Sequence, residues 1–221
     1  MNGANLPALV FDCDGLLVDS EYLASRVESE LTRELGLELS VEEAHDLFLG
    51  KTVDGVLDAI AARTGTRPSS LFAYNWAFAT AHAFKRELAP VPFVRDAVAE
   101  LMRRGHRMAV ASQSPLARVR LSLEITGLGG YFGPHVYVTS MVARPKPAPD
   151  IYLHAADRLG ASPAEAVVIE DSPAGAASAR AAGFRVIGYA PGGSAAAMRQ
   201  AGVQVLQSME ELLDAVADPS A

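Results

Sequence analysis

The sequence of 221 residues contains a single cysteine, Cys13, so it cannot form an intramolecular disulfide. It has no apolar stretch long enough to cross a bilayer, and residues 1–7 show no basic segment followed by an apolar run. We therefore expect a protein of a reducing, cytoplasmic compartment that has no membrane partner.

The sequence also lacks an excess of basic residues, internal repeats and low-complexity tracts. Its formal net charge is -7, and a surface of that sign is repelled by a phosphate backbone, which argues against nucleic-acid binding. Half of the residues are apolar, which suffices for a substantial core without disulfides or structural metals. Nothing in the sequence indicates an oligomer, so a monomer is the default expectation.

The first apolar run, residues 8–11, ends abruptly at Asp12 and is typical of a buried parallel strand. From Ser20 to about Leu88, apolar residues recur at helical spacing, and Ser40 with Glu43 forms a capping box. This segment therefore predicts a small bundle of four helices.

After Pro90 the pattern alternates between strands and helices. We predict strands at 107–112, 135–139, 166–170, 185–189 and 203–206, and helices at 93–104, 116–126, 150–159, 174–182 and through Leu212. The expected fold is α/β, a Rossmann-like parallel sheet with helices on both faces and a four-helix cap inserted after the first strand. The core would comprise residues 1–17 and 89–221, and the cap residues 18–88.

Polar residues follow the predicted strands, whose ends should meet at one crevice. Asp12 and Asp14 are two residues apart in an extended segment, so both can face one substrate atom, and Gly15 then permits a sharp turn. The pair alone is explained equally well by carboxylates that cap a helix or contact solvent.

Ser112 closes another apolar strand, and its hydroxyl beside helix amino-terminal amides suits a phosphate group. Ser114 before Pro115 is a natural helix start, for which capping is the simple explanation.

Two further segments bring opposite charges to the same edge. Lys146 lies between prolines that hold it in a stiff, extended segment, although a solvated lysine in a proline-rich turn would look the same. Glu170 and Asp171 follow a buried strand, where adjacent acids are costly unless they are paired or bind a cation. Mg²⁺, held by one or two carboxylates plus substrate phosphate, would account for them.

Together these segments resemble the haloacid dehalogenase superfamily, in its phosphatase branch, over the whole chain. The resemblance rests on Phe11–Glu21, Ser112, Lys146–Asp150 and Glu170–Gly175, in that order. It implies that Asp12 attacks phosphorus and becomes an aspartyl phosphate, while Asp14 protonates the leaving alcohol and later activates water. It also implies that Lys146 and Ser112 hold the phosphoryl oxygens, and that Mg²⁺ is bound by Asp12, the Asp14 carbonyl, Asp171 and, in support, Glu170.

The resemblance leaves other activities to weigh. Dehalogenating members lack the acid at the position of Asp14, and the cap lysines Lys51 and Lys85 lie in no recognised phosphonate-cleaving motif. The main alternative is a sugar-phosphate mutase similar to beta-phosphoglucomutase, whose histidine twelve residues after the nucleophile is replaced here by Ala24. A non-catalytic protein that binds a phosphorylated metabolite would be expected to lack one of the acids that are present.

The substrate is expected to be a small phosphorylated metabolite, because the chain is similar to members of the 6-phosphogluconate phosphatase kind. Gly15 and Gln113 would also contact the substrate, and the cap would read its leaving group through Glu21, Tyr22, Gly50 and Lys51. Trp76, Phe72 and Phe78 are interpreted as cap core, Cys13 as a packed thiol, and Gly129-Gly130 as a loop.

Overall fold

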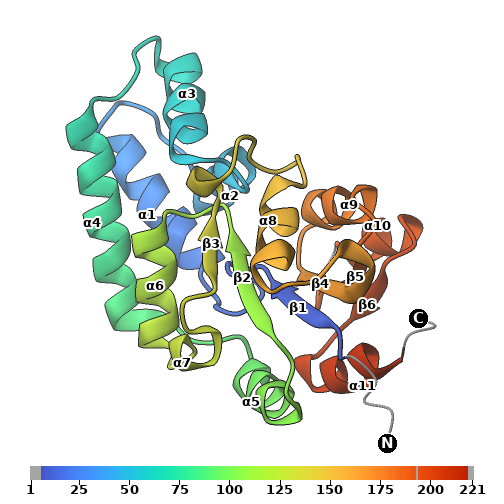
Figure 1. Cartoon of the computed structure of the whole chain (residues 1–221). Helices are drawn as coiled ribbons and strands as arrows, with labels where there is room; N and C mark the ends of the chain where they lie inside the picture. Colours follow the sequence, from blue (N-terminus) through green and yellow to red (C-terminus); the bar gives the residue numbers. More distant parts are fainter. Residues whose placement is uncertain (1–5, 193, 219–221) are drawn as a thin grey trace, which may run out of the picture.

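The computed structural model describes residues 6–192 and 194–218. A single parallel sheet of six strands in the order β3-β2-β1-β4-β5-β6 lies at its centre (Figure 1). The strands are β1 (Ala8–Phe11), β2 (Met108–Ser112), β3 (Val136–Val138), β4 (Ala166–Glu170), β5 (Arg185–Tyr189) and β6 (Gln204–Leu206). The α/β fold predicted from the alternating pattern is confirmed.

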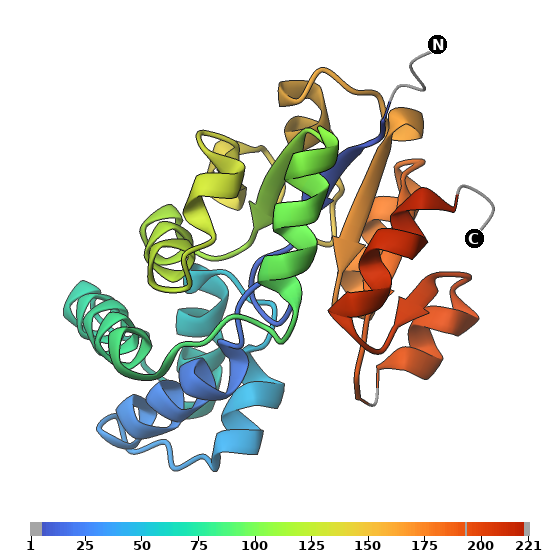
Figure 2. The same ribbon diagram turned by 90° about the horizontal axis from the view of Figure 1, so that it is seen from below.

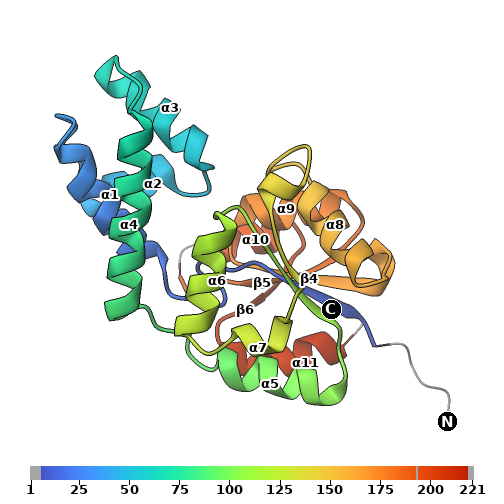
Figure 3. The same cartoon turned by 60° about the vertical axis from the view of Figure 1, so that its left-hand side comes forward.

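Alternating side chains of the strands enter two separate hydrophobic clusters, one on each face of the sheet. Leu9 and Phe11 pack on one face against α5 (Val94–Arg104), α6 (Leu116–Ile125), α7 (Gly129–Phe132) and α11 (Leu212–Ala217). Ala8 and Val10 pack on the other against α8 (Asp150–Arg158), α9 (Pro173–Ala181) and α10 (Ala195–Gln200). Figure 3 shows these two helical layers on opposite sides of the strands.

The strand order places a topological switch between β1 and β4. The chain builds outward from β1 through β2 to β3, and then returns to place β4 on the other side of β1. In such sheets the ligand crevice lies outside the carboxyl ends of the two strands at the switch. Asp12 follows β1 and Glu170 ends β4, so the switch brings these two segments together.

The first four of the helices between β1 and β2 form their own hydrophobic cluster beside the sheet (Figure 2). They are α1 (Glu21–Arg33), α2 (Val41–Phe48), α3 (Val53–Thr64) and α4 (Ser70–Glu87). The expected capping box is present: Glu43 N donates to Ser40 Oγ over 3.1 Å, and Ser40 N donates to Glu43 Oε2 over 2.7 Å. We refer to α1–α4 as the cap helices.

Two short backbone segments connect the cap helices to the sheet, and they lie side by side. Asp19 N donates to Ala89 O over 3.0 Å, and Val91 N donates to Leu17 O over 3.1 Å. These paired segments lie where the sequence predicts the chain to cross between core and cap. The pairing ties both crossings together next to Asp14, whose backbone bridges to Val18.

The structure departs from the expected elements in a few short stretches. Gly129 begins the short helix α7 instead of forming a loop, and α10 was not predicted at all. Short 3-10 helices also occur, at Thr139–Met141, Pro163–Glu165 and Met209–Glu211. Phe78, expected in the cap core, is 66% exposed on α4. Within the described ranges, none of the helices combines the length and apolar character needed to cross a bilayer.

Candidate active site

Asp12 lies immediately beyond β1, and its backbone N–H donates to Ile169 O of β4 over 2.9 Å. This bond continues the strand pairing up to the first catalytic candidate, so the position of Asp12 is set by the sheet. Gly15 then turns the chain with φ of +75°, a left-handed conformation that suits glycine. Cys13, between Asp12 and Gly15, is 1% exposed and packs in the same hydrophobic cluster as Leu9 and Phe11, as predicted.

Lys146 is buried between two carboxylates. Its Nζ donates to Asp12 Oδ1 over 2.6 Å and to Glu170 Oε1 over 2.7 Å, and it lies 4.7 Å from the centre of the Tyr152 ring. Burial would lower the pKa of Lys146, but Asp12 and Glu170 together raise it well above the usual value. Lys146 is therefore a fixed positive charge at the ends of β1 and β4.

Both carboxylate oxygens of Glu170 are fully engaged. Oε1 accepts from Lys146 and from Tyr152 Oη over 2.7 Å, while Oε2 accepts from the backbone N of Ser172 over 2.7 Å and its Oγ over 2.9 Å. Burial would raise the pKa of Glu170, but Lys146 and these donors lower it. The arrangement fixes Glu170 and, through it, Lys146.

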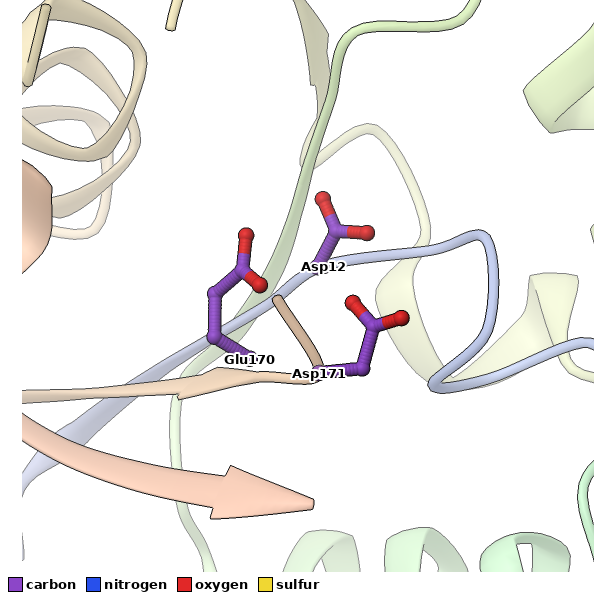
Figure 4. A group of neighbouring side chains, drawn as sticks. All are labelled: Asp12, Glu170 and Asp171. Carbon is purple, nitrogen blue, oxygen red and sulfur yellow. The ribbon is translucent and has the colours of Figure 1, made fainter. Parts of the chain in front are cut away.

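Asp12, Glu170 and Asp171 form a cluster in which one oxygen from each lies within 4.8 Å of the others. Figure 4 shows the three carboxylates converging from the ends of β1 and β4. Asp171 makes no hydrogen bond or ion pair with the rest of the described chain, and burial, with Glu170 and Asp12 next to it, raises its pKa well above the usual range. Burial likewise raises the pKa of Asp12 to about 7, although Lys146 opposes the shift.

This donor set fits a hard divalent cation. Oxygen ligands from carboxylates are those that Mg²⁺ uses in proteins, and an unpaired, half-buried carboxylate such as Asp171 lacks the compensation that a cation would supply. A methyl group at Gly15 would overlap the Asp171 carboxylate, so the glycine keeps that side of the cluster open.

Asp14 faces a different set of partners. Its Oδ1 accepts from Ser20 Oγ over 2.6 Å and from Arg118 Nη2 over 3.1 Å, and its Oδ2 accepts from Ser114 Oγ over 2.7 Å. Burial alone would raise its pKa, but Arg118, Ser20 and Ser114 lower it below the usual value. Ser112 Oγ lies 3.5 Å from Oδ2, so Ser112 and Asp14 border the same space.

The capping role expected for Ser114 is wrong. The N-cap residue of helix α6 is Pro115, and no side chain caps this helix end. The Ser114 hydroxyl instead donates a hydrogen bond to Asp14. Because Pro115 and not Ser114 occupies the N-cap position, Ser114 lies outside the helix and its hydroxyl is available to Asp14.

A cavity between the carboxyl end of the sheet and the cap helices joins these groups. It contains Asp12, Asp14, Ser112, Gln113, Lys146, Glu170 and Asp171 from the core, and Glu21, Gly50 and Lys51 from the cap. Gln113 Nε2 donates to Gly50 O, which links core and cap across it. Gly15 lines the adjoining cavity with Glu21 and Asp171.

Tyr22 is the exception among the expected site residues. It lines neither of these cavities, and its side chain is 61% exposed. Adjacent residues on an α-helix point about 100° apart, and on α1 this turn places Glu21 at the cavity and leaves Tyr22 exposed to solvent.

Several cavity residues were not identified from the sequence, namely Ser20, Glu28, His45, Ser114 and Arg118. Trp76 was interpreted as cap core, and it both packs in the cap cluster and lines the cavity. One available signal was helical spacing, because Glu21, Ala24, Ser25 and Glu28 occupy one face of α1 and all line the cavity.

Comparison with known proteins identifies the family of this chain. Residues 6–183 match the model of the haloacid dehalogenase-like hydrolase family. The chain is 34% identical over 182 residues to hexitol phosphatase B of Escherichia coli (strain K12), covering 81% of this chain and 82% of that protein. It is 29% identical over 184 residues to 6-phosphogluconate phosphatase of the same strain, covering 83% and 82%.

A solved structure of a haloacid dehalogenase family hydrolase from Deinococcus radiodurans R1, with bound phosphate and sodium, is similar throughout. It superposes with a TM-score of 0.75 at 34% identity, covering 97% of this chain and 96% of that one. The chain therefore belongs to the haloacid dehalogenase-like hydrolase family, and it is a hydrolase of that family.

Proposed function

We propose that the protein is a Mg²⁺-dependent phosphatase that hydrolyses a small phosphorylated metabolite, such as a sugar phosphate, through an aspartyl phosphate on Asp12. The observation that carries the proposal is the placement of Asp12 between Lys146 and Asp171 at the switch between β1 and β4. The relatives named as phosphatases of hexitol phosphates and 6-phosphogluconate support this substrate class.

Asp12 is the nucleophile in this proposal. Its Oδ1 is held by Lys146, while its Oδ2 accepts no hydrogen bond within residues 6–192 and 194–218, so one oxygen is free to attack phosphorus. Attack requires the ionised carboxylate, which Lys146 favours against the effect of burial. Lys146 and the Ser112 hydroxyl would hold the phosphoryl oxygens and align the phosphorus with Asp12.

Asp12, Asp171 and the backbone carbonyl of Asp14 would hold Mg²⁺, and Glu170 would support the site through Lys146. Bound Mg²⁺ supplies positive charge that offsets the crowded carboxylates and the transferring phosphoryl group. The protein's own part is to keep these oxygens together on two adjacent strand ends, where the sheet fixes their spacing.

Asp14 would donate a proton to the leaving alcohol and then accept one from water. It accepts hydrogen bonds from Arg118, Ser20 and Ser114, which lower its pKa and so favour its ionised form. To act as an acid it must take up a proton, so in the working complex its carboxyl has to exchange at least the Arg118 contact for the substrate oxygen.

A mutase of the beta-phosphoglucomutase type is disfavoured by one residue of the cavity. Ala24 is 7% exposed and lines the cavity from α1. A methyl group therefore occupies the position at which mutases of this type carry a histidine. A non-catalytic binding protein is disfavoured because Asp12, Asp14 and Asp171 are all present and lie together.

The proposal is tested by phosphate release from p-nitrophenyl phosphate with Mg²⁺ and with a chelator. We expect turnover only with Mg²⁺, and none from Asp12→Asn, whereas Asp46→Asn, at an exposed position of α2, should behave as wild type. A folded protein that binds phosphate without turning over any ester would contradict the proposal. With a sugar phosphate as substrate, an isomerised sugar phosphate in place of free phosphate would identify the mutase.

A further inference from the structure

Glu28 is a buried carboxylate in the cavity that the phosphoryl chemistry does not use. It lies on α1, is 9% exposed and lines the cavity from the cap side. Its side chain makes no hydrogen bond or ion pair with any other described residue. Burial raises the pKa of Glu28 to about 7, with Arg118 opposing.

Other residues that line the same cavity also have polar atoms without partners. Trp76 Nε1 and Arg118 Nε are buried donors, and Gln113 Oε1 is a buried acceptor, each unpaired within the described chain. Buried polar atoms are normally hydrogen-bonded, and unpaired ones call for a specific explanation. Here the unpaired atoms are mixed, because both donors and acceptors belong to residues that line one cavity.

The mixture restricts what can occupy this part of the cavity. A second phosphate or a carboxylate would satisfy the donors but would be repelled by the ionised form of Glu28. An ammonium group would pair with that form but leave the donors of Trp76 and Arg118 unpaired. A hydroxyl both donates and accepts, so a run of hydroxyls can satisfy donors and acceptors together.

The position of Glu28 matches that of a leaving group. Its carboxyl is close enough to Arg118 and Asp14 for their charges to influence it, and Asp14 is the residue proposed to protonate the leaving oxygen. Glu28 therefore lines the cavity within reach of the acid's charge, whereas none of the three clustered carboxylates is among the charges that shift its pKa.

We propose that Glu28 and Trp76 form a subsite that binds hydroxyl groups of an uncharged leaving group and discriminates against leaving groups that carry a second negative charge. This inference rests on the proposed phosphatase function and adds a selectivity that the function alone does not require. Glu28 accepts from the substrate hydroxyls, and Trp76 Nε1 donates to them. This subsite would make α1 and α4 contribute to substrate specificity, in addition to the loop of Gly50 and Lys51.

The test compares two six-carbon phosphates that differ mainly at the end remote from the phosphate, where sorbitol 6-phosphate has a hydroxyl and 6-phosphogluconate a carboxylate. We expect wild type to favour sorbitol 6-phosphate in kcat/KM. Glu28→Gln, which keeps the shape and removes the charge, should lower the ratio of the two kcat/KM values by about tenfold, equivalent to roughly 1.4 kcal/mol. Glu30→Gln, an exposed change two residues along α1, should leave the ratio unchanged.

The ratio does not depend on the fraction of folded enzyme, because both substrates are assayed on one preparation. Trp76→Phe provides a second variant that removes the donor but keeps a ring, and it should lower kcat/KM for sorbitol 6-phosphate more than for p-nitrophenyl phosphate. Wild-type preference for 6-phosphogluconate, or a ratio that Glu28→Gln changes by less than about twofold, would overturn the subsite while leaving the phosphatase intact. Absence of turnover of every ester would overturn the proposed function, and the subsite with it.

Discussion

Replacing Lys146 by methionine would remove the positive charge on which the buried carboxylates depend. Lys146 contacts Asp12 and Glu170 at 2.6 and 2.7 Å, and the side chains are 8%, 11% and 1% exposed. Breaking a buried ion pair from one side costs about 3–5 kcal/mol, because the other charge stays buried without compensation. Methionine retains much of the packing against Tyr152, so we assign this loss of unfolding free energy to charge.

The loss should depend on pH in a defined direction. Burial already raises the pKa of Asp12 to about 7, and removing Lys146 would raise it further. A carboxyl whose folded pKa lies above its unfolded value destabilises the folded state increasingly as the pH rises from the unfolded value through the folded one. The unfolding free energy of Lys146→Met should therefore fall further below wild type at pH 8 than at pH 5.5.

The assay is urea unfolding in the presence of a chelator at both pH values, with Lys85→Met as the control. Lys85 is an exposed lysine of α4, and its replacement should change the unfolding free energy by less than about 0.5 kcal/mol. The same Lys146→Met protein should lose about 10²–10³ in kcat, as expected for removal of one group that stabilises transferred charge. Equal unfolding free energies for the two lysine variants at both pH values would refute the reasoning.

Three further outcomes are expected. Gly15→Ala and Gly36→Ala both place alanine at φ of +75°, and each should lower the unfolding free energy by about 1–2 kcal/mol. Only the new methyl group at position 15 would contact Asp171. Gly15→Ala alone should therefore weaken Mg²⁺ binding, measured by calorimetric titration. Arg118→Met should cost about 2 kcal/mol at pH 7 in urea unfolding; because Arg118 lowers the pKa of Asp14, this loss should shrink as the pH falls below about 4. In urea unfolding without chelator, Mg²⁺ at about one hundred times its dissociation constant should raise the unfolding free energy by about 2.7 kcal/mol. No increase would contradict the metal site.

Much of the fold and the core of the site were predictable because they depend on local patterns. Apolar runs that end in polar residues locate the strand ends, and parallel strands bring such ends to one edge of the sheet. Asp12 and Glu170 lie at strand ends, and Lys146 lies between prolines that restrain its backbone. The three side chains therefore meet at that edge.

The surroundings of Asp14 were harder to predict because they depend on how one helix is rotated against another. Arg118 reaches Asp14 only because α6 turns that side chain toward β1, and no local pattern fixes this rotation. Tyr22 was misplaced for a related reason, since the motif that includes it is linear in sequence whereas α1 turns successive side chains in different directions. Glu28 and Trp76 join the cavity through the packing of α1 and α4, which the periodicity of either helix alone does not specify.

The central claim is that Asp12 forms a covalent bond to the transferred phosphoryl group. The most direct measurement is acid quenching of wild-type enzyme during turnover with Mg²⁺ and substrate, followed by borohydride reduction and peptide mass spectrometry, since reduction converts an aspartyl phosphate to homoserine. We predict homoserine at position 12 in the sample with substrate and aspartate there in the sample without it. Homoserine at any other acidic residue, with Asp12 unchanged, would contradict the account.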